Sequence, residues 1–257
     1  MRKGQFEQLP VEVHPDNASL GQAAAEAAAG ILKAAIVERG RANLIVATGN
    51  SQLSFYAALR NRDDINWQKI TLFHMDEYVG MAPEHPASFR RYLQHNIVSY
   101  VHPSVFYGVM GDAADPLQEC ERYAGLLHDH PADLCCLGIG ENGHLAFNDP
   151  PFAKFDDPFW AKIVKLDEAS RRQQVGEGYF ASLAEVPTQA ITLTIPALLA
   201  ARRVLAIVPE LRKAPAVLAA LTGPITTECP ASVLRTVSHA RLYLDIESAS
   251  QVPGLTR

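Results

Sequence analysis

The sequence predicts an α/β protein in which helices cover both faces of a single, doubly wound and mostly parallel sheet, as in Rossmann-like folds. Short apolar runs with strand character alternate with longer amphipathic segments from end to end. The apolar runs are nearly continuous, as expected of parallel strands that are buried on both faces. No repeat, low-complexity linker or shift in composition divides the sequence, so we expect one domain over residues 1–257.

The first predicted element is an alanine-rich helix over residues 19–39, which Asn17 can cap and Gly40 can end. The segment 150–158, with its neighbouring phenylalanines, is typical of an ordered loop or lid rather than of a linker. The other predicted helices cover residues 53–60, 87–98 and 117–129, and the predicted strands cover residues 43–47, 70–73, 133–137, 163–166, 190–193, 204–208 and 241–244.

Composition excludes several classes of protein. The chain has 257 residues, 48% of them hydrophobic, with 28 acidic and 23 basic side chains and a net charge of −5. This balance excludes a disordered chain and disfavours a nucleic-acid binder that acts through bulk charge. No apolar run approaches the roughly 20 residues that span a bilayer, and no secretory signal is visible. Because no Cys-x-x-Cys pair occurs, we expect free thiols and no bound metal. The charge balance and the absence of a long apolar run lead us to expect a soluble, cytoplasmic protein without membrane or nucleic-acid partners.

Three segments that leave predicted strands are candidates for the functional site, because ligands bind beyond the carboxyl ends of parallel strands. The first segment comprises Thr48, Gly49, Asn50 and Ser51. Small residues before a helix N-terminus let backbone N–H groups and hydroxyls approach an anion. No Gly-Lys-Ser/Thr follows, so ATP is not implied. The segment fits either a phosphate site or a tight strand–helix turn that a serine caps.

The second segment places Asp76 and Glu77 directly after an apolar strand. Consecutive side chains of an extended segment point in opposite directions, so only one carboxylate faces a given cleft. Asp76 is placed to be the base, and the alternative is a solvated acidic turn.

The third segment is the glycine-rich loop 138–150, in which His144 stands near Asn142 and Asp149. A histidine in such a loop, with amide and carboxylate partners, suits a positioned proton shuttle. The alternative is a loop histidine without a chemical task.

Together and in this order, the segments resemble the glucosamine-6-phosphate deaminase family, which is related to the 6-phosphogluconolactonases. The resemblance extends over residues 44–244. A lactonase typically carries Asp-Glu-Arg at the second segment and Asp-Gly-His-Thr-Ala at the third, whereas this chain has Tyr78 and Leu145 there, so the deaminase branch fits better. The motifs that carry the resemblance are MDEYV (75–79), EHPASF (84–89), NGHLAFN (142–148), VPTQAITL (186–193) and Lys213.

The resemblance implies an enzyme that isomerises a 2-amino-2-deoxyhexose 6-phosphate and releases ammonia, without a metal or organic cofactor. Asp76 corresponds to the base that moves a proton between C2 and C1, and His144 to the group that opens the sugar ring. Asn142 and Asp149 occupy the positions at which the family has the partners of that histidine. The phosphate-binding positions fall on Thr48, Gly49, Asn50, Ser51 and Lys213.

Several positions depart from the family pattern. Many members have Asp where this chain has Asn142, and Glu where it has Asp149. The phosphate-binding arginine of the family falls at Gly176, so we expect Arg171 or Arg172 to take over its contact. The segment 151–162 lacks the family's allosteric Ser and Arg pattern, so we expect little amino-sugar activation and either a monomer or a homo-oligomer.

Two other functions stay open. A hydrolase of the 6-phosphogluconolactonase type needs water activated by His144 but no base at C2. A non-catalytic sugar-phosphate sensor would account for the changed residues at 142, 149 and 176. The identity of the hexosamine epimer is also open, because epimers differ at one hydroxyl that a single side chain can read.

Overall fold

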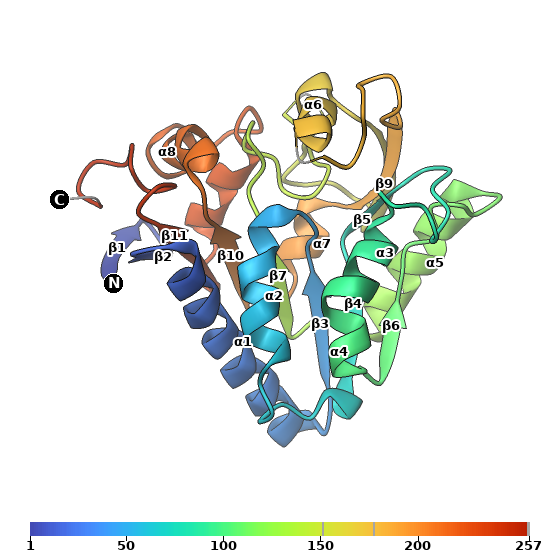
Figure 1. The fold of residues 1–257 in the computed structure, drawn as a ribbon, viewed down its shortest axis with the longest axis horizontal. Helices are drawn as coiled ribbons and strands as arrows, with labels where there is room; N and C mark the ends of the chain where they lie inside the picture. Colours follow the sequence, from blue (N-terminus) through green and yellow to red (C-terminus); the bar gives the residue numbers. More distant parts are fainter. Residues whose placement is uncertain (151, 177, 256–257) are drawn as a thin grey trace.

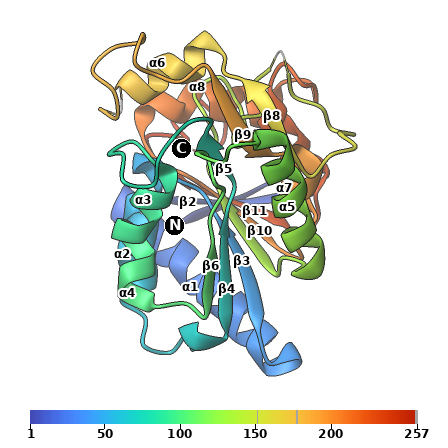
Figure 2. The same cartoon turned by 90° about the vertical axis from the view of Figure 1, so that its right-hand side faces the viewer.

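A computed structural model describes residues 1–150, 152–176 and 178–255. Part of the expected lid (150–158) and the last two residues of the expected domain therefore lie outside the described residues. The architecture is a large sheet with helices packed on both of its faces and a smaller sheet above one edge (Figures 1 and 2). The predicted α/β class and its mostly parallel main sheet are confirmed.

The main sheet has eight strands in the order β1-β2-β11-β10-β7-β3-β4-β6. The hairpin β1–β2 is antiparallel, and every other neighbouring pair is parallel. The strands are β1 (Arg2–Phe6), β2 (Leu9–His14), β3 (Ala42–Val46), β4 (Ile70–His74), β6 (Val105–Tyr107), β7 (Leu134–Leu137), β10 (Val204–Val208) and β11 (Ala240–Asp245).

The strand order reverses between β3 and β7, which are direct neighbours in the sheet. From β3 the chain continues outward through β4 and β6, and from β7 it continues in the opposite direction through β10 and β11. The connections that leave two such strands diverge and open a crevice at the carboxyl edge, where α/β proteins bind ligands. The first and third candidate segments follow β3 and β7, so both lie at this crevice.

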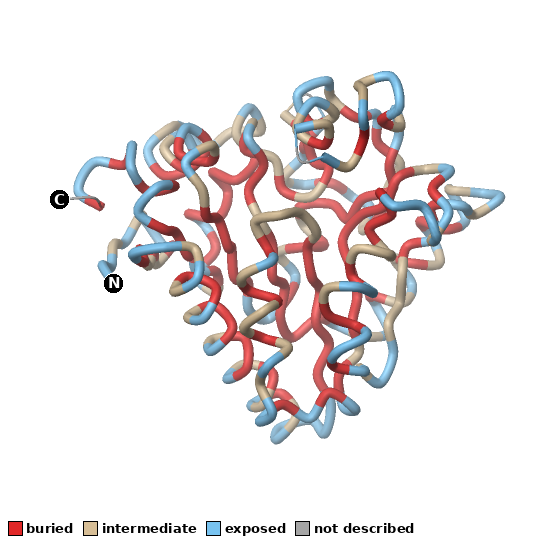
Figure 3. The backbone as a smooth tube through the Cα atoms, in the orientation of Figure 1, coloured by how far each residue is buried: buried red, intermediate tan, exposed pale blue. Residues whose placement is uncertain are grey.

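Two buried cores, one on each face, hold the helices to the main sheet (Figure 3). Alternation along β7 shows the division, because Cys135 packs in one core and Cys136 in the other, both as free thiols. The face of Cys136 is covered by α1 (Asn17–Arg39), α2 (Leu53–Arg60) and α3 (Phe89–Leu93), whereas the face of Cys135 is covered by α5 (Pro116–Asp129), α7 (Ile195–Leu199) and α8 (Ala214–Thr222).

Helix α1 begins two residues earlier than expected, at Asn17. Its N-cap is Asp16 rather than Asn17, because the Asp16 carboxylate accepts a hydrogen bond from the Ser19 backbone N–H while the Ser19 hydroxyl completes a capping box. The helix ends as expected at Gly40, where φ is 75°.

By length and composition, α1 is also the one helix among the described residues that could cross a membrane. Its buried side chains lie on one stripe against the sheet, whereas Glu26, Lys33 and Glu38 lie on the other face. A helix with one charged face and one buried face fits the core of this fold, so we interpret α1 as a core helix.

A second sheet corrects the expectation of a single sheet. The strands predicted near residues 163–166 and 190–193 do not join the main sheet. They pair with each other, and the second of them also pairs with a strand at Asp76 that was not predicted. The order of this second sheet is β5-β9-β8, and both pairs are antiparallel. These strands are β5 (Asp76–Tyr78), β8 (Ala161–Lys165) and β9 (Gln189–Leu193).

Other elements escaped prediction or have different limits. The predicted helix 87–98 begins two residues later, because the Ser88 side chain caps α3 by accepting from the Arg91 backbone N–H. It continues as a π-helical segment (Gln94–Val98) and ends in α4 (Ser99–Val101). The elements that were not predicted are β1, β2, β6, α6 (Glu168–Gly176), α7 and α8.

Candidate active site

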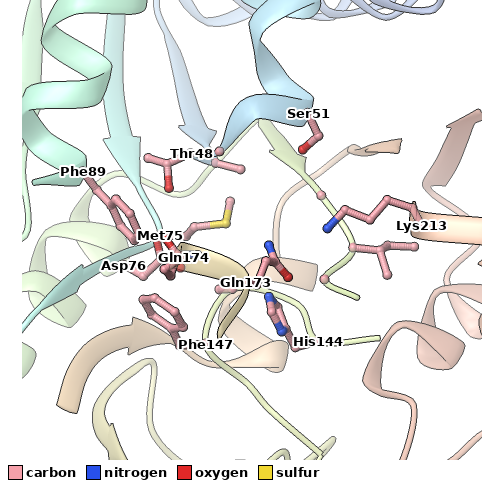
Figure 4. Close-up of a pocket in the computed structure, with 16 residues that line it drawn as sticks. Thr48, Ser51, Met75, Asp76, Phe89, His144, Phe147, Gln173, Gln174 and Lys213 are labelled. Carbon is pink, nitrogen blue, oxygen red and sulfur yellow. The ribbon is translucent and has the colours of Figure 1, made fainter. Parts of the chain in front are cut away.

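A pocket with about 550 Å3 of empty space, part of it open to solvent, lies at the carboxyl edge of the main sheet, at the reversal of strand order (Figure 4). The segments after β3, β4 and β7 form its floor, α6 covers it, and the turn before α8 closes one side. The three candidate segments, which are distant in sequence, therefore meet in one place. Thr48, Asp76, His144 and Lys213 all line this pocket.

The segment after β3 presents Thr48, Gly49 and Ser51 to the pocket. Gly49 has φ 102° and ψ 159°, a conformation that a side chain disfavours, and it redirects the chain into a short 3₁₀ turn before α2. The Tyr92 hydroxyl donates to the Gly49 carbonyl at 2.7 Å and fixes this bend. Asn50 was expected in the same set, but its side chain accepts from the Tyr179 hydroxyl at 3.3 Å and does not line the pocket.

Asp76 is the first residue of β5 and is only 6% exposed. Its Oδ1 atom has no hydrogen-bond partner among the described residues. Burial, and secondarily the charge of Glu77, raise the pKa of Asp76 from 3.8 to about 8. A carboxylate in these surroundings is a stronger base than an exposed one, because desolvation disfavours its charged form.

Glu77 points away from the pocket, as the alternation along a strand predicts. Its carboxylate accepts hydrogen bonds from the backbone N–H groups of Tyr78, Phe89 and Arg90 and from the Ser88 hydroxyl. Glu77 thus anchors the start of α3 to β5 and holds the neighbouring Asp76 in place. The alternative of a solvated acidic turn is wrong, because the Glu77 side chain is fully buried.

The His144 ring is held from its Nδ1 side. This atom lies 2.7 Å from Asn142 Oδ1, 3.1 Å from Asp149 Oδ1 and 3.0 Å from Ser170 Oγ. Because the amide and carboxylate oxygens can only accept, Nδ1 carries a proton, and in the neutral ring Nε2 therefore keeps its lone pair. The ring also packs directly on Gly140, where an added Cβ would lie 2.2 Å from Cε1 of the ring.

Asp149 is 1% exposed and reaches His144 although it is one methylene shorter than glutamate. Burial alone would raise its pKa, but the hydrogen bond and charge of His144, together with hydrogen bonds from Ser170 and Asn142, hold the pKa at about 2. The Asp149 carboxylate is therefore charged over the physiological range and can stabilise a protonated His144.

Lys213 is 2% exposed, and its amino group points into the same space as the His144 ring in Figure 4. It lies at the end of a 3₁₀ turn (Leu211–Lys213) that follows Glu210. Glu210 has φ 84° and ψ 140°, a conformation that is costly for a residue with a side chain, and its N–H donates to Asp245 at 3.0 Å. The fold thus holds a strained turn that places Lys213 in the pocket.

Neither arginine expected to replace the missing family arginine lines the pocket. The Arg171 guanidinium donates to the carbonyls of Leu183 and Val186, and Arg172 pairs with Glu168 on the exposed side of α6. Gly176 ends this helix with open space around it.

Instead, α6 turns Ser170, Gln173 and Gln174 toward the site. These residues were not predicted from the sequence, because α6 has no apolar periodicity. The spacing i, i+3, i+4 of three small or amide side chains was the available signal. Met75, Phe89 and Phe147, which give the pocket apolar walls, were missed as well.

Within residues 1–150, 152–176 and 178–255, no three His, Cys, Asp or Glu side chains lie close enough to hold a metal ion. What the pocket offers chemically is a hydroxyl-bearing loop, a buried ammonium, a buried carboxylate and an oriented histidine. These groups can bind an anion and transfer protons.

The fold and the pocket define a class of α/β protein. In this class a loop suited to bind an anion and a pair of acid–base side chains meet where the strand order of the sheet reverses. Comparison with known proteins specifies the family. The chain belongs to the glucosamine-6-phosphate isomerases/6-phosphogluconolactonase family, whose model matches residues 15–243.

Curated relatives and solved structures agree with this membership. A glucosamine-6-phosphate deaminase of Exiguobacterium sibiricum is 38% identical over 80% of this chain and 79% of its own. One of Bacillus cereus (strain B4264) is 34% identical over 88% and 84%. A solved monomeric glucosamine-6-phosphate deaminase has a TM-score of 0.84 and 31% identity, covering 93% of this chain and 98% of that one. A 6-phosphogluconolactonase from Shewanella baltica OS155, with a TM-score of 0.74 and 18% identity over 94% and 99%, shares the fold.

Proposed function

We propose that this protein is an enzyme that converts glucosamine 6-phosphate and water into fructose 6-phosphate and ammonia. The observation that carries the proposal is the presence in one pocket of Asp76, a buried carboxylate with an unpaired oxygen, and His144, a ring whose Nδ1 is engaged. The relatives named as glucosamine-6-phosphate deaminases support the same reaction. Each group has a distinct task in that chemistry.

His144 opens the sugar ring. With its proton on Nδ1, facing Asn142 and Asp149, the ring presents Nε2 as the acceptor for the anomeric hydroxyl proton. The imidazolium then delivers a proton to the ring oxygen, and the C1–O bond to that oxygen breaks to give the open-chain aldehyde. The charged Asp149 stabilises the imidazolium during this transfer.

Asp76 isomerises the open chain. Its carboxylate removes the proton from C2, which the C1 aldehyde acidifies, while the aldehyde oxygen takes up a proton from solvent, and an enolamine forms. The same carboxyl group returns the C2 proton to C1, so that C2 becomes an iminium carbon. Water adds to C2 and returns a proton to solvent, and ammonia leaves as the resulting carbinolamine becomes the ketose phosphate. General acid–base steps of this kind contribute roughly 10²–10⁴-fold to the rate.

The phosphate group would bind where Thr48, Ser51 and Lys213 line the pocket. Thr48 and Ser51 supply hydroxyl donors, Gly49 permits a close approach of the backbone, and Lys213 supplies a buried positive charge. Local donors, and not the net charge of −5, would therefore account for the affinity for a dianion.

The test is incubation of the purified protein with glucosamine 6-phosphate, with ammonia and fructose 6-phosphate both measured. We expect equal amounts of the two products and a loss of about 10²–10⁴-fold in Asp76→Asn. A parallel reaction with 6-phosphogluconolactone distinguishes the deaminase from the lactonase alternative, which needs no base at C2. Lactone hydrolysis without ammonia release would reject the proposal, and tight binding without any turnover would favour the sensor.

Two further properties belong to the proposal. A solved relative at 31% identity is described as monomeric, which supports a monomer here, and light scattering after size exclusion tests it. A phosphorylated sugar does not cross a bilayer unaided because its charge is costly to bury. An enzyme that acts on one is therefore expected in the cytoplasm, which fractionation of the source cells tests.

A further inference from the structure

We propose that Gln174 is the specificity-determining residue of this pocket: its side-chain oxygen accepts a hydrogen bond from a hydroxyl on C3 or C4 of the sugar phosphate. The inference rests on the proposed function for the identity of the substrate. It adds the residue that distinguishes one hexosamine phosphate from another, which neither the sequence motifs nor the relatives assign.

The first observation is an unsatisfied atom. Gln174 lines the pocket and is 7% exposed, and its Oε1 atom is buried without a hydrogen-bond partner among the described residues. Buried polar atoms are paired in the great majority of cases, because an unpaired one loses its hydration without replacement. An orphaned oxygen in a ligand pocket is therefore best explained by a donor that the ligand brings.

The second observation concerns the other side chains of α6 around Gln174. The Ser170 hydroxyl binds Asp149 and His144, and Gln173 Oε1 accepts from the Glu141 backbone N–H at 3.2 Å. Arg171 is directed to the carbonyls of Leu183 and Val186. The inward oxygen of Gln174 is thus the acceptor on this helix that the described contacts leave open for a substrate.

The chemistry of the substrate selects the partner. A phosphate dianion offers only acceptors to an amide oxygen, so the Gln174 Oε1 atom does not bind that end. The C1–C2 end must face Asp76 and His144 for the proton transfers. Between these two ends a hexosamine 6-phosphate has hydroxyl groups on C3 and C4, and both are donors. A pocket that pairs a substrate hydroxyl discriminates strongly against analogues without it, because its own polar atom is then left unpaired.

The kinetic test combines the variant Gln174→Met, which keeps the length of the side chain and removes the amide, with substrates that lack one hydroxyl. We expect kcat/KM for glucosamine 6-phosphate to fall about 10- to 100-fold. With either the 3-deoxy or the 4-deoxy analogue, the substitution should cost nothing further, because the interaction is already absent. Gln118→Met, the same change at an exposed position of α5, is the control and should leave both rates unchanged.

A binding measurement keeps the inference testable without turnover. Calorimetry with glucitol 6-phosphate and with inorganic phosphate compares the wild type, Gln174→Met and Gln118→Met. We expect Gln174→Met to lower the affinity for the hexitol phosphate about tenfold and to leave the affinity for inorganic phosphate unchanged. Equal losses for both ligands, or none for either, would overturn the role of Gln174. Failure of the wild type to release ammonia would instead overturn the proposed function, since the hexitol affinities do not depend on it.

Discussion

The Oδ1 atom of Asp149 lies 3.1 Å from Nδ1 of His144, close enough for a charge-assisted hydrogen bond. The side chain is one methylene shorter than glutamate, yet it makes this contact because Asp149 is buried at the end of the same loop. Ser170 donates to the same oxygen from α6, and Asn142 donates to it at 3.1 Å. The histidine is therefore oriented by one charged and two neutral groups.

Removal of the Asp149 charge should slow ring opening. We expect Asp149→Asn to lower kcat/KM about 100-fold, because the imidazolium form of His144 loses its counter-charge. The measurement is ammonia release from glucosamine 6-phosphate. Asp156→Asn, the same change at an exposed position of the neighbouring segment, is the control. Equal rates in the two variants would show that Asn142 and Ser170 suffice to orient the ring.

Gly140 should be irreplaceable for a steric reason. A Cβ at this position would lie 2.2–2.4 Å from three atoms of the His144 ring, so Gly140→Ala must displace the histidine. We expect a drop in kcat of at least about 100-fold, with the affinity for inorganic phosphate retained. Gly125→Ala in α5, where an added Cβ meets open space, should keep full activity and stabilise the helix by about 1 kcal/mol. A fully active Gly140→Ala protein would contradict the packing of the ring on this glycine.

The buried Asp76 should make stability depend on pH in a definite direction. Its pKa is raised from 3.8 to about 8 by burial and by Glu77, so the folded protein keeps a proton that the unfolded chain has released. The free energy of unfolding should then decrease as the pH rises from about 4 to about 8. Asp76→Asn cannot ionise and should gain in Tm relative to the wild type across this window. A constant difference in Tm over the same range would refute the raised pKa.

Glu77 should contribute, after burial, to the pH at which the enzyme becomes active. The working form of Asp76 is the carboxylate, so we expect kcat/KM to increase with pH up to about 8. Glu77→Gln removes a neighbouring negative charge, which should lower the pKa of Asp76 and move the acidic limb of the profile down by roughly one unit. Glu84→Gln, an exposed position in the following loop, should leave the profile in place. Circular dichroism of Glu77→Gln checks that α3 keeps its anchor.

The sequence was sufficient to predict the parts of the site that follow parallel strands. Asp76 follows β4 and His144 follows β7, and the carboxyl ends of the parallel strands meet at one edge of the sheet, so their meeting in a pocket could be anticipated. Their catalytic roles stay predictions. The positions of Arg171 and Arg172 could not be anticipated, because they depend on where α6 lies and which of its faces turns inward.

The elements that were missed share a physical cause. The strand at Asp76 exists because Asp76 pairs with Thr192, more than a hundred residues later in the chain, and a local pattern contains no information about such a partner. In the described part of the chain, the hairpin β1–β2 joins the rest of the sheet only through β11. Helix α6 is polar and short, and it is held by contacts such as those of Ser170 with the His144 loop.

The place of β11 between β2 and β10 has a consequence for biosynthesis. Among the residues that the structure describes, the hairpin at the start of the chain has β11 as its only neighbour in the sheet, with Val11 opposite Leu242 and Val13 opposite Leu244. Until the ribosome has released the residues of β11, the first strands have no edge to join, although α1 and β3 are already available. Completion of the sheet is thus a late event that closes a loop spanning most of the chain, and such non-local closure slows folding.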